Sequence, residues 1–129
     1  MAAMGERSKP VSILIVDDDE AIRCITAEFF RDCGFEVIEA EDAHEARTCF
    51  YAHQDKFLLM ITDVIMPGDM DGIELAQWVS RHFPATAILV MSGYTGGESV
   101  GFPFVQKPFT LGRVAEIAGR LIGRSRVLS

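Results

Sequence analysis

Acidic side chains directly follow two apolar segments of this 129-residue chain, and their type and position suit them to chemistry. The apolar run 11–16 is followed by four acids at 17–20, and the apolar run 58–61 is followed by Thr62 and Asp63. An ionised carboxylate placed at the end of a buried strand costs folding free energy unless something binds it. We therefore expect these acids to form a functional site.

Asp17, Asp18 and Asp63 should meet if their strands are neighbours, because the carboxyl ends of parallel strands share one crevice where ligands bind. Two unit charges about 4 Å apart repel by roughly 4 kcal/mol at an effective dielectric near 20. Three carboxylates therefore need a counter-charge or bound protons. Oxygen ligands favour Mg²⁺, Mn²⁺ or Ca²⁺, and Mg²⁺ commonly binds phosphate oxygens as well, which points to phosphoryl chemistry. For Asp19 or Glu20 alone, helix capping or solvation is the favoured interpretation.

Composition narrows the class of protein. The net charge of −7 argues against a nucleic-acid partner, because phosphate contacts require clustered Lys and Arg. No window approaches the roughly 18–20 consecutive apolar residues of a membrane-spanning helix, so no membrane partner is expected. Cys24, Cys33 and Cys49 lack paired spacing and are predicted to be buried or half-buried thiols of a reducing compartment. A cytoplasmic protein is the resulting prediction.

The hydrophobic pattern alternates between strand and helix along the chain. The predicted strands are 11–16, 35–40, 57–62, 87–91 and 104–106, and the predicted helices are 20–33, 43–53, 73–82 and 110–124. This order is typical of an α/β protein with a three-layer, doubly wound, five-stranded parallel sheet.

One domain is expected over residues 11–124, between a flexible N-terminal tail at 1–10 and a C-terminal tail at 125–129. Segment 93–103 contains four glycines in eleven residues, so we expect a short, mobile or poorly formed helix there. In helix 20–33, apolar residues including Ile25 and Phe30 recur at helical spacing, and Cys33-Gly34 is expected to stop the helix.

Two further strand ends add a hydroxyl, Ser92, and a cation, Lys107. With these residues the chain resembles the receiver domains of two-component response regulators, specifically those of the single-domain type. The resemblance rests on the order of Asp17-Asp18, Asp63, Pro67, Asp71-Gly72, Ser92-Gly93 and Lys107-Pro108. It implies a flavodoxin-like fold with strand order 2-1-3-4-5, and a signalling module rather than an enzyme.

The resemblance also implies roles for the acids. Asp63 is similar to the phosphoacceptor, which takes a phosphoryl group from a phosphohistidine of a sensor histidine kinase or histidine phosphotransfer protein. Asp18, Asp63 and the backbone carbonyl of Ile65 are implied Mg²⁺ ligands, and Asp17 would act directly or through water. These expectations fit the chemistry, because Mg²⁺ neutralises charge on the transferred phosphoryl group.

Three more roles follow from the same resemblance. Lys107 is the implied charge partner of the phosphoryl oxygens, Ser92 the switch hydroxyl and Phe104 the switch aromatic residue. The output would be a contact with a downstream protein that the sequence does not identify. The family also implies a cis peptide at Lys107-Pro108, and a kinase-facing surface formed by the start of helix 20–33 and the loop after Lys107.

The chain departs from the family pattern in its loops. Gly68 and Asp69 make the loop after Asp63 one residue longer than usual, and the segment between Ser92 and Lys107 is several residues shorter. The bulky residues Ile65 and Tyr94 flank the expected phosphoryl site by family position. We therefore predict slow self-dephosphorylation.

Two alternatives to the receiver have partial support in the sequence. A haloacid dehalogenase-like phosphohydrolase carries an Asp-x-Asp-x-Thr pattern; Asp17 and Asp19 match its acids, but Ala21 stands where the Thr belongs. A degenerate receiver used only as a scaffold is disfavoured because no expected acid, hydroxyl or lysine is missing.

Overall fold

The computed structural model of the chain describes residues 12–53, 57–93 and 101–123. In chain order the elements are β1 (Ser12–Val16), α2 (Glu20–Asp32), β2 (Glu36–Ala40), α3 (Ala43–His53), β3 (Phe57–Asp63), α4 (Gly72–His82), β4 (Ala87–Ser92), β5 (Phe104–Gln106) and α5 (Leu111–Leu121). These bounds agree with the sequence-based elements to within a few residues. The predicted tails, Tyr94 and most of segment 93–103 lie outside the described residues.

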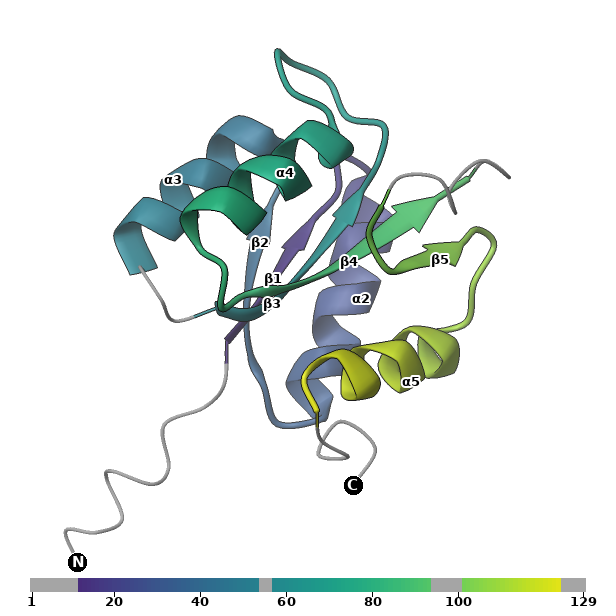
Figure 1. Cartoon of the computed structure of the whole chain (residues 1–129). Coiled ribbons are helices and arrows are strands. Elements are labelled where there is room, and N and C mark those ends of the chain that lie inside the picture. The colour runs from purple at the N-terminus through teal and green to yellow at the C-terminus, as the bar shows by residue number, and fades with distance from the viewer. Residues whose placement is uncertain (1–11, 54–56, 94–100, 124–129) are drawn as a thin grey trace, which may run out of the picture.

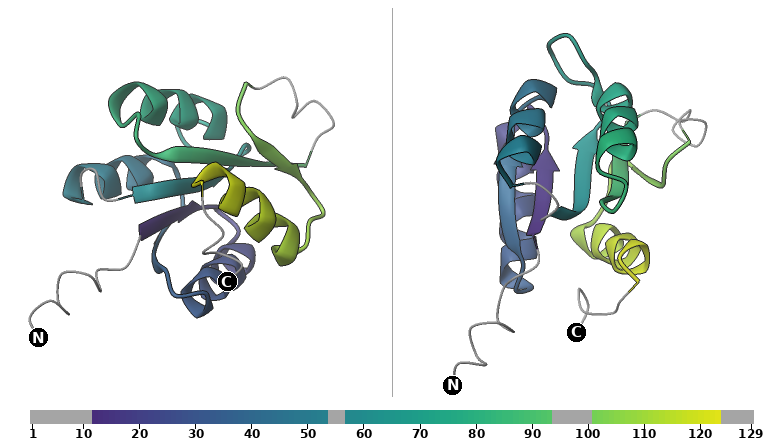
Figure 2. Two further views of the ribbon diagram at one scale, coloured as in Figure 1. Left: turned by 60° about the horizontal axis from the view of Figure 1, so that its bottom comes forward. Right: turned by 60° about the vertical axis from the view of Figure 1, so that its left-hand side comes forward.

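All strand pairs in the sheet are parallel, and the strand order is β2-β1-β3-β4-β5. Helices α3 and α4 cover one face of the sheet, and α2 and α5 cover the other (Figure 1, Figure 2). The predicted three-layer, doubly wound architecture with order 2-1-3-4-5 is therefore confirmed. Because the strands run in the same direction, their carboxyl ends lie along one edge of the sheet.

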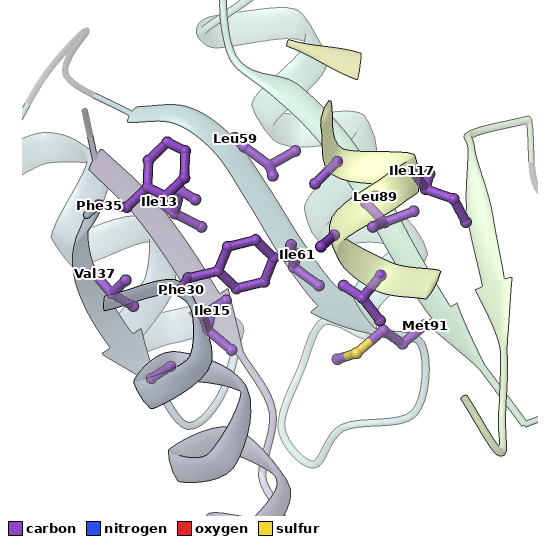
Figure 3. Close-up of a cluster of buried hydrophobic side chains, with 14 of the residues drawn as sticks. Ile13, Ile15, Phe30, Phe35, Val37, Leu59, Ile61, Leu89, Met91 and Ile117 are labelled. Carbon is purple, nitrogen blue, oxygen red and sulfur yellow. The ribbon is translucent and has the colours of Figure 1, made fainter. Parts of the chain in front are cut away.

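Two hydrophobic clusters hold the layers together, one on each face of the sheet. Along β1, Ile13 and Ile15 point towards α2 and α5, whereas Leu14 and Val16 point towards α3 and α4. Figure 3 shows the first cluster, in which Phe30 of α2 packs over the sheet. Successive residues of a strand point to opposite faces, and both faces of this sheet are covered by helices. Nearly every position in a central strand is therefore buried, which explains why the strands are continuous apolar runs in the sequence.

Side-chain caps define where the helices begin. Asp19 caps α2 through a 3.2 Å hydrogen bond from the Ile22 amide, and Thr110 accepts one of 3.1 Å from Arg113 at the start of α5. After α2, Gly34 has a φ of +100°, a left-handed conformation that glycine adopts readily. The capping interpretation of Asp19 and the sequence-based stop of this helix are confirmed.

One expectation about α2 was wrong: Cys24 is exposed rather than buried or half-buried. Ile25 is also exposed, at 58%. The helix buries a narrow stripe comprising Thr26, Ala27 and Phe30. The neighbouring apolar positions lie on its flank, facing the loop before α5. Separately, among the described residues no helix is long and apolar enough to cross a bilayer.

Candidate functional site

The acids that follow β1 and β3 meet at the carboxyl edge of the sheet. The two strands are hydrogen-bonded neighbours, so Asp17 and Asp18 after β1 lie beside Asp63 at the end of β3. One carboxylate oxygen from each of the three residues lies within 4.8 Å of the others. The predicted convergence of these side chains is confirmed.

Asp17 is the most constrained of the three acids, because it is completely buried. Its Oδ1 accepts a 2.9 Å hydrogen bond from the Asp19 amide, while Oδ2 has no hydrogen-bond partner within the described part of the chain. Burial raises the pKa of Asp17 above its ordinary value, and the nearby charges of Asp63 and Asp18 add to this rise. A buried, unpartnered carboxylate oxygen beside two other carboxylates suits a hard divalent cation.

Asp63 is paired with the cation that follows β5. Lys107 Nζ lies 3.1 Å from Asp63 Oδ2, and the two side chains are 27% and 11% exposed, respectively. Lys107 is held in turn by its backbone, since its amide donates a 2.7 Å hydrogen bond to the carbonyl of Ser92. The peptide between Lys107 and Pro108 is cis, as the family resemblance implied. One oxygen of the partly accessible Asp63 carboxylate is thus already next to a positive charge.

The loop from Asp63 to α4 packs tightly against the backbone of the site. Gly72 begins α4 so close to β3 that a Cβ there would lie 1.8 Å from the Asp63 carbonyl oxygen. Its amide donates a 2.8 Å hydrogen bond to the Val64 carbonyl. Asp71 and Glu74 form a reciprocal capping box. Glycine at position 72 therefore does more than admit the helix start: it lets the helix approach Asp63.

The three remaining predicted residues come from β4, β5 and the loop after β3. Ser92 ends β4 and is 2% exposed. Phe104 begins β5, is half-buried and packs against the hydrophobic cluster on the α3–α4 face. Ile65 follows Asp63 by two residues and is 55% exposed.

Sequence reasoning missed two residues that support the site. The Thr62 hydroxyl donates a 3.0 Å hydrogen bond to the Asp63 carbonyl, and Arg23 donates one of 2.8 Å to the Asp17 carbonyl. From the sequence, Thr62 is predicted to be an ordinary strand residue and Arg23 a solvent-facing helix residue. The sequence pattern does not reveal the role of Arg23, because the partners of Arg23 come from other elements.

Comparison with known proteins identifies the family. The model of the response regulator receiver domain matches residues 13–118, which include every strand end described above. The chain belongs to the response regulator receiver domain family.

The relatives of this receiver domain are longer proteins. Protein PetR of Rhodobacter capsulatus is 37% identical over 109 residues, covering 79% of this chain and 44% of PetR. Nitrogen assimilation regulatory protein NtrX of Azorhizobium caulinodans is 28% identical over 123 residues, covering 89% of this chain and 27% of NtrX. In the rice two-component response regulator-like protein PRR37, the matched region is 10% of the protein. The chain therefore spans less than half the length of each of these relatives.

Solved receiver structures share the fold over most of the chain. The receiver domain of the hybrid histidine kinase CckA superposes with a TM-score of 0.75 at 32% identity, covering 86% of this chain and 98% of that one. Response regulator TrrA of Thermotoga maritima, in complex with Mg²⁺-BeF, superposes with a TM-score of 0.76 at 28% identity, covering 85% and 97%. These findings support the receiver and give no support to the haloacid dehalogenase-like hydrolase.

Proposed function

We propose that Asp63 is the phosphoacceptor of this receiver domain. The observation that carries the proposal is the Asp63 carboxylate, 3.1 Å from Lys107 Nζ and clustered with Asp17 and Asp18. An oxygen of Asp63 attacks the phosphorus of a phosphohistidine, the N–P bond breaks, and its electron pair stays on the imidazole. Charge on the transferred group is the main obstacle, and the Lys107 ammonium offsets part of it.

The same proposal assigns the cation-binding groups. Asp17, Asp18, Asp63 and the backbone carbonyl of Ile65 would hold Mg²⁺, with Asp17 acting directly or through water. The Oδ2 atom of Asp17, buried and without a hydrogen-bond partner among the described residues, is the group whose chemistry most clearly suits such an ion. Bound Mg²⁺ would neutralise charge on the phosphoryl oxygens and on the clustered acids. Lys107 and the acids supply the rest of the binding site for the phosphoryl group.

Labelling by a small phosphodonor tests the phosphoacceptor. In the presence of Mg²⁺, acetyl phosphate should add one phosphoryl group to the parent chain, measured by intact-protein mass, and Asp63→Asn should abolish this addition. Asp69→Asn is the matched control, because Asp69 lies in the following loop with a side chain that is 79% exposed. Equal labelling of Asp63→Asn and the parent would overturn the proposal.

Ser92 and Phe104 would carry the response. An acyl phosphate on Asp63 offers oxygens that can accept hydrogen bonds from Lys107 and from the Ser92 hydroxyl. Movement of Ser92 towards the phosphoryl group would vacate space for the half-buried Phe104 ring. The signal would then be a population shift, read by a downstream protein that contacts the rearranged surface. Ser92→Ala should leave labelling measurable while removing the chemical-shift changes at Phe104 in NMR spectra.

A histidine-bearing helix of a kinase or phosphotransfer protein would dock in the apolar groove beside the site. The groove has a volume of about 490 Å³, and Lys107 lines it as well as contacting Asp63. An occupant of this groove is therefore next to the phosphoacceptor. The rest of its lining is mainly apolar and comes from α2, the residue after β4 and the segment leading into α5: Ile22, Ile25, Thr26, Gly93, Pro108, Phe109 and Leu111.

A charged side chain introduced into this groove distinguishes docking of the partner protein from the phosphorylation reaction itself. Ile25→Asp should prevent phosphotransfer from a histidine kinase or phosphotransfer protein that phosphorylates the parent, while acetyl phosphate still labels Asp63. Tyr51→Asp is the control, because Tyr51 on α3 is similarly exposed, at 62% against 58% for Ile25. If the two variants accept the phosphoryl group from the partner protein equally well, the groove is not the docking site.

Slow self-dephosphorylation is also part of the proposal. The exposed Ile65 side chain lies two residues past Asp63, where it can hinder an attacking water. The double variant Ile65→Asn with Tyr94→Glu should shorten the phosphoryl lifetime, measured by the decay of the labelled mass. An unchanged lifetime would contradict this part.

The domain limits and location belong to the same proposal. We place the receiver domain at residues 11–124, around the family match at 13–118. The cysteines Cys24, Cys33 and Cys49 are free thiols, which fits a reducing compartment and a cytoplasmic location.

A further inference from the structure

Arg23 links the acidic site to the outer strand of the sheet. It lies in the first turn of α2, and its side chain is only 15% exposed. Its Nε lies 3.2 Å from Glu39 Oε1 on β2, and its Nη1 donates a 2.8 Å hydrogen bond to the backbone carbonyl of Asp17. The planar guanidinium can satisfy both partners at once, whereas an ammonium group cannot reproduce this fork.

The Arg23 contact completes the restraint of the segment that carries two of the clustered acids. The Asp17 amide donates to the Ala40 carbonyl at 3.1 Å, and Asp17 Oδ1 accepts from the Asp19 amide at 2.9 Å. Arg23 holds the Asp17 carbonyl, which belongs to the peptide linking Asp17 to Asp18. Because the plane of this peptide is held, the direction of the Asp18 side chain is restrained as well. That side chain is exposed and points towards Asp63.

We propose that Arg23 is a positioning residue for the divalent-cation site, acting through the Asp17–Asp18 peptide and anchored by Glu39. This inference rests on the proposed function, since it concerns the same Mg²⁺ site. Arg23 binds Glu39 through Oε1, while Arg31 Nη1 lies 3.2 Å from the other oxygen, Oε2, so the two arginines hold separate atoms of this carboxylate. Outer groups that orient metal ligands typically change metal affinity by about 10–100-fold when removed.

Charge and positioning predict opposite results for Arg23. A cation near a metal site repels Mg²⁺, so removal of Arg23 would strengthen Mg²⁺ binding if its charge were its only influence. If Arg23 orients the Asp17–Asp18 peptide, its removal weakens Mg²⁺ binding instead. The sign of the change therefore separates the two effects.

Arg31 provides a matched control on the same helix. Like Arg23, it forms one ion pair with Glu39, and it also donates one hydrogen bond to a backbone carbonyl, that of Val37 at 3.0 Å. The Val37 carbonyl is remote from the acids. Arg23→Ala and Arg31→Ala thus remove similar interactions, but only Arg23→Ala releases the Asp17 carbonyl.

Mg²⁺ titration of the unphosphorylated full chain, followed by the amide NMR signals of Asp17, Asp18 and Asp19, tests the inference. Arg23→Ala should raise the Mg²⁺ dissociation constant by about 10-fold, whereas Arg31→Ala should stay within about 2-fold of the parent. Arg23→Lys keeps the charge and should also bind Mg²⁺ more weakly. This conservative variant serves as the test should Arg23→Ala fail to fold.

Each outcome has a defined meaning. Unchanged or tighter Mg²⁺ binding by folded Arg23→Ala or Arg23→Lys overturns the positioning role. Equal weakening by Arg23→Ala and Arg31→Ala also overturns it, because the cause would then be general loosening of α2. If the parent chain itself binds no Mg²⁺, the proposed cation site fails, and the inference fails with it.

Discussion

The amino ends of the strands form one edge of the sheet, the amino edge, and their carboxyl ends form the other, the carboxyl edge. The two edges differ in how their side chains contribute to stability. At the amino edge, aromatic rings from α3, β3 and the end of α4 pack around Phe50. Its ring centroid lies 5.0 Å from that of Phe57 and 4.9 Å from that of Phe83. The polar groups of this edge take part in the packing as well: the Thr86 hydroxyl donates a 2.8 Å hydrogen bond to the Phe57 carbonyl. This edge is arranged for stability.

At the carboxyl edge, polar groups are gathered at a cost in stability. Asp17 is fully buried with a raised pKa, and its Oδ2 lacks a hydrogen-bond partner within the described residues. Within the described part of the chain, Lys107 is the cation paired with Asp63, at 3.1 Å. The comparison shows that the packing of the layers and of the amino edge stabilises the fold enough to offset the cost of clustering acids at the carboxyl edge. Removal of a packed ring at the amino edge should therefore lower stability, whereas removal of a buried charge at the carboxyl edge should raise it.

Phe50→Ala should have the largest effect. Removal of this buried ring, which is 1% exposed, creates a cavity at the amino edge and should lower the unfolding free energy, by about 3–5 kcal/mol. Urea denaturation measures the change. Tyr51→Ala, next in sequence but 62% exposed, should cost much less. Equal losses for the two variants would mean that the amino edge is not the stabilising edge.

Gly72→Ala should have an intermediate effect and should damage the site as well as the fold. The new Cβ would collide with the Asp63 carbonyl, so the backbone must shift, with a cost of about 1–3 kcal/mol for overpacking. Labelling by acetyl phosphate should slow in parallel. Gly112→Ala is the control, because a Cβ there meets nothing closer than Thr110 Oγ1 at 4.0 Å and helix propensity favours alanine. A Gly72→Ala variant as stable as Gly112→Ala would contradict the close approach of α4 to Asp63.

Asp17→Asn should have a smaller effect of the opposite sign. The neutral amide can still accept from the Asp19 amide, and it removes a buried charge that is repelled by Asp63 and Asp18. Without Mg²⁺ at neutral pH, the melting temperature should rise by a few degrees, equivalent to about 1 kcal/mol. Mg²⁺ binding should weaken at the same time. Asp69→Asn, at an exposed loop position, should change neither property; a fall in the melting temperature of Asp17→Asn would refute the cost assigned to Asp17.

At low pH, the melting temperature of Asp17→Asn should no longer exceed that of the parent. Because burial raises the pKa of Asp17 above 3.8, the folded parent takes up this proton at a higher pH than the unfolded chain does. The resulting stabilisation of the parent is fully present below pH 3.8 and is lost as the pH rises through the raised pKa. The difference in melting temperature between variant and parent should therefore shrink as the pH falls from neutral towards about 4. Melts across this range, without Mg²⁺, measure it; a constant difference would mean that Asp17 does not titrate in this way.

Much of the site was predictable because its residues follow strands. Asp17, Asp18, Asp63, Ser92 and Lys107 each come at or directly after the end of an apolar strand. In a parallel sheet such ends share an edge, so chain position alone predicts proximity once the strands are recognised. The caps Asp19 and Thr110 were predictable for a similar reason, since a cap contacts amides only three residues away.

The details that could not be predicted from the sequence depend on contacts between elements that are distant along the chain. The exposure of Ile25 follows from how α2 lies against the sheet and α5, which hydrophobic periodicity within one helix does not specify. The two roles of Arg23 require Glu39 on β2 and the Asp17 carbonyl after β1. The need for glycine at position 72 arises where the start of α4 meets the end of β3.

The sequence by itself determined the order of strands and helices, the helix caps, the family and the set of acids that meet. Local periodicity and short-range hydrogen bonds encode the elements, and parallel strand direction brings their ends together. Only the tertiary structure decided which carboxylate oxygen is left buried without a partner, which arginine restrains the acidic segment and which helix flank forms the groove. Those properties depend on distances between side chains and backbones of non-adjacent elements, and such distances exist only once the layers have packed.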